Sequence, residues 1–230
     1  MSHSDEEVVE NLKHWWSRFG TASMLGLAVV LFAFAGWRYW DSSRDEAATA
    51  AAKLGQQMVT AQQRLIANPD DKAANTELQR LGRQIIDEYG STPYAIDASL
   101  LLARRAVDQG DLAGAAKQLR ATLDMGLEAD TEVVVRTRLA RVLAAQKQFD
   151  AALAELAELE SVGLEPLVAE IRGDIALQKG DREAARAAYQ AADKALADRD
   201  EARPVLDLKL ADVGLEPAKR ASDQPAEARN

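Results

Sequence analysis

The chain has 230 residues and a formal net charge of −9, and aromatic residues make up only 5% of it. The acidic balance argues against nucleic-acid binding, because contacts to phosphates need a basic face. Cysteine is absent, and both histidines, His3 and His14, lie near the amino terminus. Thiol chemistry and imidazole chemistry are therefore excluded from the rest of the chain, where abundant Ala, Leu, Glu, Gln and Arg favour helix.

The first predicted element is an apolar run of nineteen uncharged residues from Phe19 to Trp37. As a helix it would span roughly 28 Å, close to the thickness of the hydrocarbon core of a bilayer. We therefore expect an amino-terminal segment over 1–18 and a single transmembrane anchor over 19–40. Aromatic and basic residues typical of a membrane interface flank the run, namely Trp15, Trp16, Trp37, Arg38, Tyr39 and Trp40.

A cleaved signal peptide is the alternative, because Ala33-Phe34-Ala35 resembles a cleavage site. Against cleavage, the run is longer than the usual apolar core of a signal peptide, and the residues before it are acidic rather than basic. Orientation stays open from the charges alone, since Lys13 and Arg18 precede the run while Arg38 and Arg44 follow it.

The next segment lacks glycine and proline from Trp37 to Leu54. We expect the anchor helix to continue through it as a stalk, as far as a turn at Asn68-Pro69-Asp70-Asp71. A second helix is predicted from Ala73 to Tyr89, and it stops before Gly90. Together these helices resemble a degenerate first repeat unit.

Internal repeats follow. Aligning Ala115, Ala152 and Ala185 gives steps of 37 and 33 residues, on either side of the 34 residues of a tetratricopeptide repeat. Small residues stand twelve positions earlier and large apolar residues four positions later, as expected where paired helices cross; these are Ala103, Ala140 and Gly173, and then Leu119, Leu156 and Tyr189. The pattern predicts an all-α solenoid over 41–213, with a short capping helix after Pro204 and a disordered tail over 214–230.

A solenoid of this kind offers a groove for a peptide or a helix of a partner rather than a deep catalytic pocket. No phosphate-binding loop, nucleophile elbow or metal-spaced cluster occurs in the sequence. We therefore predict a non-enzyme with no catalytic, cofactor-binding or metal-binding residues and no small-molecule substrate. Counting from the aligned alanines, the groove-facing residues would be Leu100, Arg104, Val107, Thr137, Arg141, Glu170, Asp174 and Leu177, with Arg104 and Arg141 suited to an acidic partner segment.

Several motifs carry a resemblance to one family. They are Gly36-Trp37-Arg38-Tyr39-Trp40, Tyr94-Ala95, Leu139-Ala140-Arg141-Val142, Val168-Ala169-Glu170-Ile171-Arg172-Gly173-Asp174 and Lys179-Gly180-Asp181-Arg182-Glu183-Ala184-Ala185-Arg186. With the single apolar run before them, they make the chain similar, from about residue 5 to residue 213, to the YfgM family, the ancillary tetratricopeptide subunits of the bacterial SecYEG translocon.

The resemblance implies a single-pass type II protein of the bacterial inner membrane with its repeats in the periplasm. Its implied partners are the SecYEG translocon and PpiD, a membrane-anchored periplasmic folding factor, and its implied task is to link translocating chains to periplasmic chaperones. The residues alone leave two alternatives open: a scaffold for cell-envelope assembly machinery, and a cleaved, soluble periplasmic chaperone. The role of the tail after Val213 and the identity of the clients are not predicted.

Overall fold

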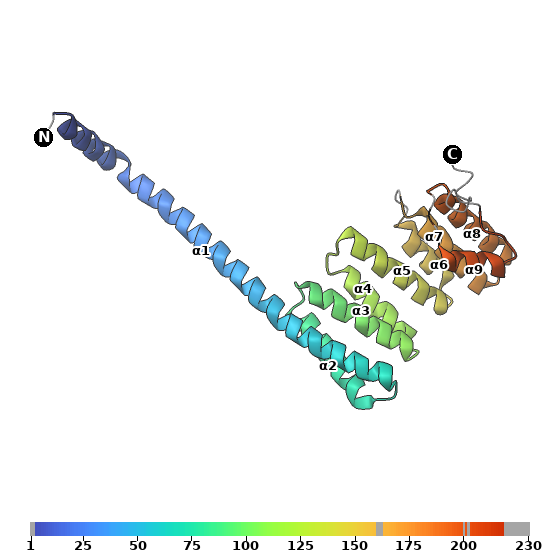
Figure 1. Cartoon of the computed structure of the whole chain (residues 1–230). Coiled ribbons are helices and arrows are strands. Elements are labelled where there is room, and N and C mark those ends of the chain that lie inside the picture. The colour runs from blue at the N-terminus through green and yellow to red at the C-terminus, as the bar shows by residue number, and fades with distance from the viewer. Residues whose placement is uncertain (1–2, 160–162, 200, 202, 219–230) are drawn as a thin grey trace, which may run out of the picture. The chain divides into compact units, whose positions relative to one another are not determined.

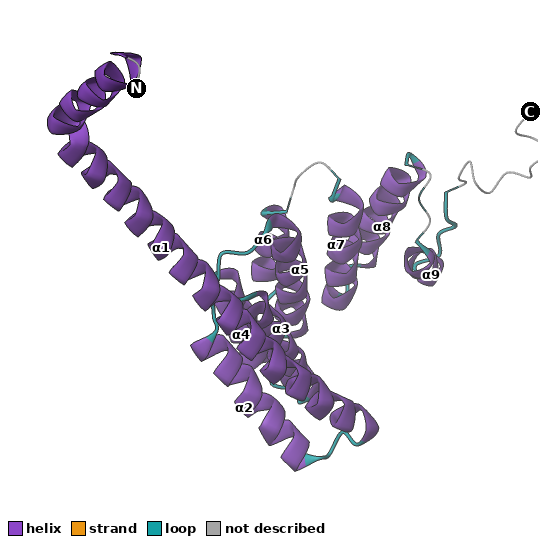
Figure 2. Ribbon diagram, turned by 60° about the vertical axis from the view of Figure 1, so that its left-hand side comes forward, coloured by secondary structure: helices purple, strands orange, loops and turns teal. Residues whose placement is uncertain are grey.

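The computed structural model describes residues 3–159, 163–199, 201 and 203–218. Within the first helix, it describes the side chains of Trp16 and of residues 24 onward. All regular secondary structure in these described ranges is helical (Figure 2). The helices are α1 (His3–Ala67), α2 (Lys72–Glu88), α3 (Pro93–Asp108), α4 (Leu112–Leu123), α5 (Ala129–Ala145), α6 (Phe149–Ala157), α7 (Glu165–Lys179), α8 (Arg182–Ala197) and α9 (Pro204–Asp212).

The chain divides into two compact units, Met1–Lys53 and Leu54–Asn230. The first unit consists of the amino-terminal part of α1. Its side chains from Met24 to Trp40 are almost all exposed, including Leu25, Phe32 and Phe34. Among the described residues, no helix combines the length and the apolarity needed to cross a membrane.

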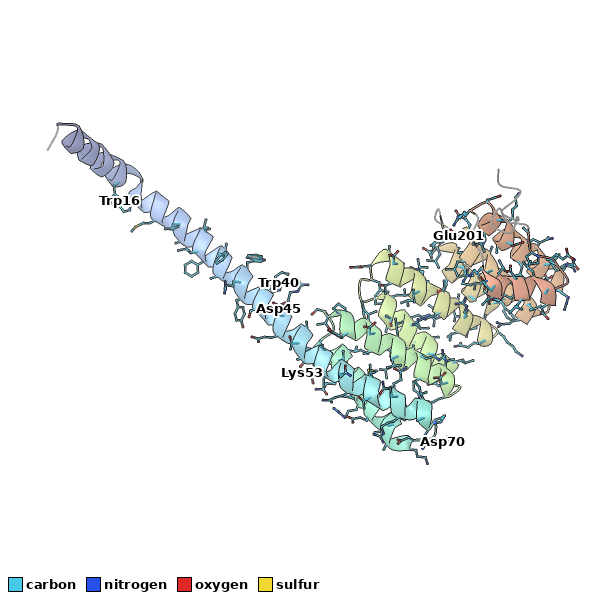
Figure 3. All side chains as sticks on the ribbon, in the orientation of Figure 1. Trp16, Trp40, Asp45, Lys53, Asp70 and Glu201 are labelled. Atoms are coloured by element: carbon cyan, nitrogen blue, oxygen red, sulfur yellow. The ribbon has the colours of Figure 1, made fainter. Side chains whose placement is uncertain are left out.

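The predicted stalk and turn are confirmed. Helix α1 continues without a break to Ala67, and a turn that includes Asp70, labelled in Figure 3, leads into α2. Asp71 caps α2, because its side chain accepts a hydrogen bond from the Ala74 N–H at 2.9 Å. This hydrogen bond, together with the Arg64 guanidinium 2.8 Å from the Asp71 carboxylate, keeps the pKa of Asp71 below its usual value.

The second unit is a stack of helix pairs, as the repeats predict. Helix α3 pairs with α4, α5 with α6 and α7 with α8, and each pair also contacts the next (Figure 1). The last turns of α1 pair with α2 in the same way, since Met58, Ala61 and Leu65 share a buried core with Leu78 and Ile85. The degenerate first unit is therefore a real helix pair.

The aligned small residues lie where the paired helices cross. Ala103, Ala140 and Gly173 are buried, as are Ala115, Ala152 and Ala185. The large apolar residues Leu119, Leu156 and Tyr189 are buried beside them. In the α7–α8 unit the partner is the larger tyrosine and the small residue is glycine. A Cβ on Gly173 would lie only 2.3 Å from the Tyr189 ring, so no larger residue fits at this crossing.

The tight turns inside the α3–α4, α5–α6 and α7–α8 units each contain a left-handed residue. Gly110 and Gly180 have φ of 77° and 86°, and the following Asp111 and Asp181 cap α4 and α8 with their side chains. In the α5–α6 unit, the middle one of these three, Lys147 takes this position with φ of 62°, and Gln148 makes no side-chain capping bond. The middle turn is therefore the least well matched of the three, because a left-handed conformation costs a non-glycine residue about 1 kcal/mol.

Replacing Lys147 with glycine should raise the free energy of unfolding by about 1 kcal/mol, since glycine adopts this φ without strain. Adding Gln148→Asp should contribute about 1 kcal/mol more through a helix cap. Thermal unfolding of the full chain measures both effects. The reverse change, Gly180→Lys, is the control and should lower the unfolding temperature. A lower unfolding temperature for Lys147→Gly would contradict the claim that Lys147 is strained at this φ.

Helix α9 caps the stack as predicted. Leu206, Leu210 and Val213 are buried against a core that includes Ala185 and Leu196 of α8. The five residues after Val213 are not helical, yet Leu215 packs against the same core and the Ala218 N–H donates to the buried carboxylate of Asp193 at 2.6 Å. The remainder of the predicted tail, residues 219–230, lies outside the described residues.

Candidate partner-binding face

The predicted groove residues of α3 differ in their environments. Arg104 is exposed and forms an ion pair with Asp108 at 2.8 Å. Leu100 is partly buried and packs against the core of the neighbouring helices. Val107 is one of the exposed large apolar residues. Of these three, Arg104 and Val107 are accessible to a partner.

The two predicted residues of α5 separate in the same way. Thr137 is only 6% exposed, and its hydroxyl donates to the Val134 carbonyl at 3.0 Å. Arg141 is exposed and has no ion-pair partner among the described residues. Thr137 is therefore inaccessible to a partner, whereas Arg141 is available.

The predicted residues of α7 do not face an open groove, and here the expectation is wrong. Glu170 is 2% exposed; its Oε1 lies 2.7 Å from the Lys209 ammonium of α9, and its Oε2 lies 2.9 Å from Arg203. Lys209 also bridges to Asp174 at 2.6 Å. Leu177 packs against the core shared by α8 and α9. The capping helix covers this part of α7 and neutralises its carboxylates.

Tyr189 completes this charged cluster. Its hydroxyl donates to Asp174 Oδ1 at 2.9 Å, and Lys209 lies 5.9 Å from the centre of its ring. Burial of the phenol is the main reason why the pKa of Tyr189 lies above its ordinary value. The hydrogen bond to Asp174 and the negative charges of the nearby carboxylates raise it further. The tyrosine is therefore protonated at neutral pH and acts as a donor that holds Asp174 in place.

The reason for the mixed outcome is helical register. Residues three before and four after a given position share its face of a helix. Leu100, Thr137 and Glu170 each stand three residues before a small crossing residue, so they turn toward the neighbouring helices. Val107 and Leu177 stand four residues after one and are partly turned the same way. Arg104 and Arg141, each directly after a crossing residue, are exposed, whereas Asp174 at the same register position of α7 is bonded to Tyr189 of α8 and to Lys209 of α9.

The accessible positions form a stripe along the first helices α1, α3 and α5, which we call the inner stripe. Its members are spaced i, i+4, i+7 and i+11, and all are exposed or partly exposed. They are Gly55, Val59, Gln62 and Ile66 on α1, Asp97, Leu101, Arg104 and Asp108 on α3, and Val134, Arg138, Arg141 and Ala145 on α5. Sequence reasoning missed Arg138, although the aligned alanines place it beside Arg141.

A cleft joins the inner stripes of α1 and α3. Its volume is about 280 Å³, and its lining consists of Gln62, Leu65, Ile66, Pro69, Leu78, Leu101, Arg104, Arg105 and Asp108. Ile66 is 74% exposed at its edge. The two stripes therefore face one common, largely apolar hollow with an ion pair beside it.

The predicted interfacial residues lie along α1. Trp16, Trp37, Tyr39 and Trp40 are exposed, as is Arg38, and Figure 3 shows Trp16 and Trp40 projecting from the helix. The side chain of Trp15 lies outside the described residues. Arg44 stacks on the Trp40 ring at 4.8 Å, and the Ser43 hydroxyl donates to the Trp40 carbonyl at 2.8 Å. The guanidinium of Arg44, one helical turn after Trp40, therefore lies over the Trp40 ring.

Comparison with known proteins agrees with this architecture. A family model described as "Tetratricopeptide repeat-like domain" matches residues 13–215. The chain is 34% identical over 188 residues to the "Ancillary SecYEG translocon subunit" of Escherichia coli (strain K12), covering 82% of this chain and 86% of that protein. The chain belongs to this family of ancillary translocon subunits.

Other family members are more distant. The chain is 25% identical to the subunit of the same name from Haemophilus influenzae, over 83% of this chain and 89% of the relative. It is 24% identical to that of Neisseria gonorrhoeae, over 90% of this chain and 95% of the relative. No solved structure gives a significant match. Of the residue positions predicted to contact a partner, those on α3 and α5 are the more accessible in this chain, and Glu170 of α7 is buried.

Proposed function

We propose that the chain is a non-catalytic, membrane-tethered adaptor at the Sec translocon. The observation that carries this proposal is the 34% identity, over most of both chains, to a protein named as an ancillary SecYEG subunit. The stack of helix pairs supports a binding role, because such stacks present extended surfaces for protein segments. On this account the chain links translocating periplasmic or outer-membrane chains to periplasmic chaperones, with a PpiD-like folding factor as a second partner.

The tether is the apolar run from Phe19 to Trp37. Its residues 19–23 have side chains outside the described set, and the described remainder exposes Leu25, Phe32 and other apolar groups. Exposed apolar side chains along one continuous helix are unfavourable in water and favourable in a bilayer. We place the amino terminus in the cytoplasm, the helix in the inner membrane and the repeats in the periplasm.

Tethering would make weak contacts sufficient. A binding surface held beside the translocon meets emerging chains at a high effective concentration, so that each individual contact needs little affinity. Of the predicted contact residues, Arg104, Val107 and Arg141 are accessible for this task. Replacing both Arg104 and Arg141 with glutamate should therefore reduce the recovery of partners while the helical content stays unchanged.

Co-purification tests association with the translocon. The full chain, extracted from membranes in mild detergent, should retain SecY, SecE and SecG, and the Arg104→Glu/Arg141→Glu variant should retain at most about a tenth as much. Lys117→Glu/Arg120→Glu on α4 makes the same charge change at exposed positions and serves as the control. Equal recovery of the translocon by both variants would remove the inner stripe from the proposal.

Topology tests the tether. Because the chain has no cysteine, a single Lys117→Cys variant carries one unique thiol on α4. A membrane-impermeant maleimide should label it in intact cells, whereas Ser4→Cys should react only after the membrane is opened. Labelling in the reverse order would contradict the proposed orientation. A mature mass lacking the first 35 residues would instead favour the cleaved periplasmic chaperone.

A further inference from the structure

The inner stripes differ in how their charges are satisfied. Arg104 is neutralised by Asp108 at 2.8 Å, and Asp174, at the same register position of α7, is neutralised by Lys209 at 2.6 Å. Arg138 and Arg141 of α5 are both exposed, and neither has an ion-pair partner among the described residues. The middle unit therefore presents two uncompensated guanidinium groups three residues apart, which makes them neighbours on the helix surface.

Apolar surface lies along the same stripes. Val134 stands one turn before Arg138 and is 39% exposed. Arg104, which occupies the register position of Arg141 one unit earlier, lines the 280 Å³ cleft together with Ile66 and Leu101. Arg141 therefore occupies, one unit later, the register position of an arginine that lines the apolar cleft.

We propose that this face binds an acidic protein segment with a large apolar side chain, whose carboxylates meet Arg138 and Arg141 while the apolar side chain enters the cleft between α1 and α3. Guanidinium groups pair with carboxylates through two parallel hydrogen bonds, which gives orientation as well as attraction. An apolar anchor in a hollow contributes much of the affinity at such interfaces. The proposal rests on the proposed function only in assuming that this face contacts another protein.

The charge of the whole chain selects a protein ligand over a nucleic acid. At a net charge of −9 the chain repels a long polyanion, whereas two local arginines attract a short acidic segment within a Debye length of about 8 Å. The apolar part of the cleft, lined by Leu65, Ile66 and Leu101, suits a leucine or phenylalanine side chain. Binding should therefore weaken as salt concentration rises, without disappearing.

The test is a fluorescence-polarisation titration of the full chain in detergent with three synthetic peptides. The first contains leucines and glutamates, the second has every glutamate replaced by glutamine, and the third has every glutamate replaced by lysine. The wild-type chain should bind the glutamate peptide at least about tenfold more tightly than the glutamine peptide. The Arg138→Gln/Arg141→Gln variant should lose this preference, and Arg138→Glu/Arg141→Glu should prefer the lysine peptide.

A matched control separates local recognition from general charge. Lys117→Glu/Arg120→Glu changes two exposed basic residues at the same i, i+3 spacing on α4, and it should keep the wild-type preference. Circular dichroism verifies that each variant folds. Equal affinity of the wild type for the glutamate and glutamine peptides would overturn the proposal, and so would an equal loss in the control variant.

The titration contains no translocon, so its outcome is independent of the co-purification above. If the wild-type chain shows no preference for the glutamate peptide but still recovers SecYEG, the acidic ligand is rejected and the adaptor role remains. A clear preference with no recovery of SecYEG would keep this face as an acidic-segment site and reject the translocon assignment.

Discussion

Replacing Gly173 with alanine should lower the free energy of unfolding by about 2 kcal/mol, although alanine is the better helix former. The added Cβ would lie 2.3 Å from Cε1 and 2.4 Å from Cδ1 of Tyr189, so α7 and α8 must move apart or the ring must rotate. Neither is easy, because Tyr189 is buried and its hydroxyl is bonded to Asp174. For a chain of this size, the unfolding midpoint should fall by roughly 6 °C.

The other repeat units supply the rescue for this variant. They place alanine opposite leucine at the same crossing, in the pairs Ala103 with Leu119 and Ala140 with Leu156. Gly173→Ala/Tyr189→Leu recreates that pair. The free energy of unfolding of the double variant should therefore exceed the value expected from adding the two single effects by about 1.5 kcal/mol. Asp174 then keeps its bond to Lys209.

A second glycine provides the control. In α1, a Cβ on Gly55 would lie 3.6 Å from Tyr94, which is an ordinary contact, so Gly55→Ala should be neutral or slightly stabilising. If Gly173→Ala proved as stable as wild type, or if the double variant showed no coupling, the crossing would not be as tight as described.

The second large effect concerns the charged cluster beneath α9. Lys209→Met removes the ammonium that lies 2.7 Å from Glu170 and 2.6 Å from Asp174. Among the described residues, Glu170, which is 2% exposed, then keeps Arg203 as its one ion-pair partner, so a buried carboxylate loses half of its compensation. Breaking a buried ion pair on one side typically costs 3–5 kcal/mol, and we expect about 3 kcal/mol here because Arg203 remains.

Chemical denaturation of the full chain measures the loss. Hydrogen exchange should locate it in α9, whose amides should become less protected than those of α3. Lys117→Met, at an exposed site with no ion pair among the described residues, should change stability by less than about 0.5 kcal/mol. A similarly small effect of Lys209→Met would show that the carboxylates do not depend on α9.

Much of the solenoid follows from short-range patterns. The small residues at 103, 140 and 173 and the large ones sixteen positions later share a register, and their burial follows from helix geometry. Turn chemistry was equally readable at Gly110-Asp111 and Gly180-Asp181. The middle turn lacks both residues and still forms, because tertiary packing of α5 on α6 outweighs the local preference of Lys147.

The candidate site was less predictable for a physical reason. The aligned small residues identify the first helices, but Thr137 and Glu170 stand three residues before a crossing residue and are buried, so they do not reach the accessible surface. The pairing of Glu170 with Lys209 joins residues 39 positions apart and has no local sequence signal. Arg138, by contrast, was within reach of the same register argument that identifies Arg141.

The most direct test of the adaptor role is site-specific cross-linking in intact inner membranes. Ala145→Cys places a unique thiol on the inner stripe of α5, and Lys117→Cys places one on α4. With a short photoactivatable maleimide on each, the account predicts that position 145 gives a product containing a subunit of the SecYEG translocon and that position 117 gives little or none. Products without any translocon subunit at position 145, or equal yields at both positions, would contradict it.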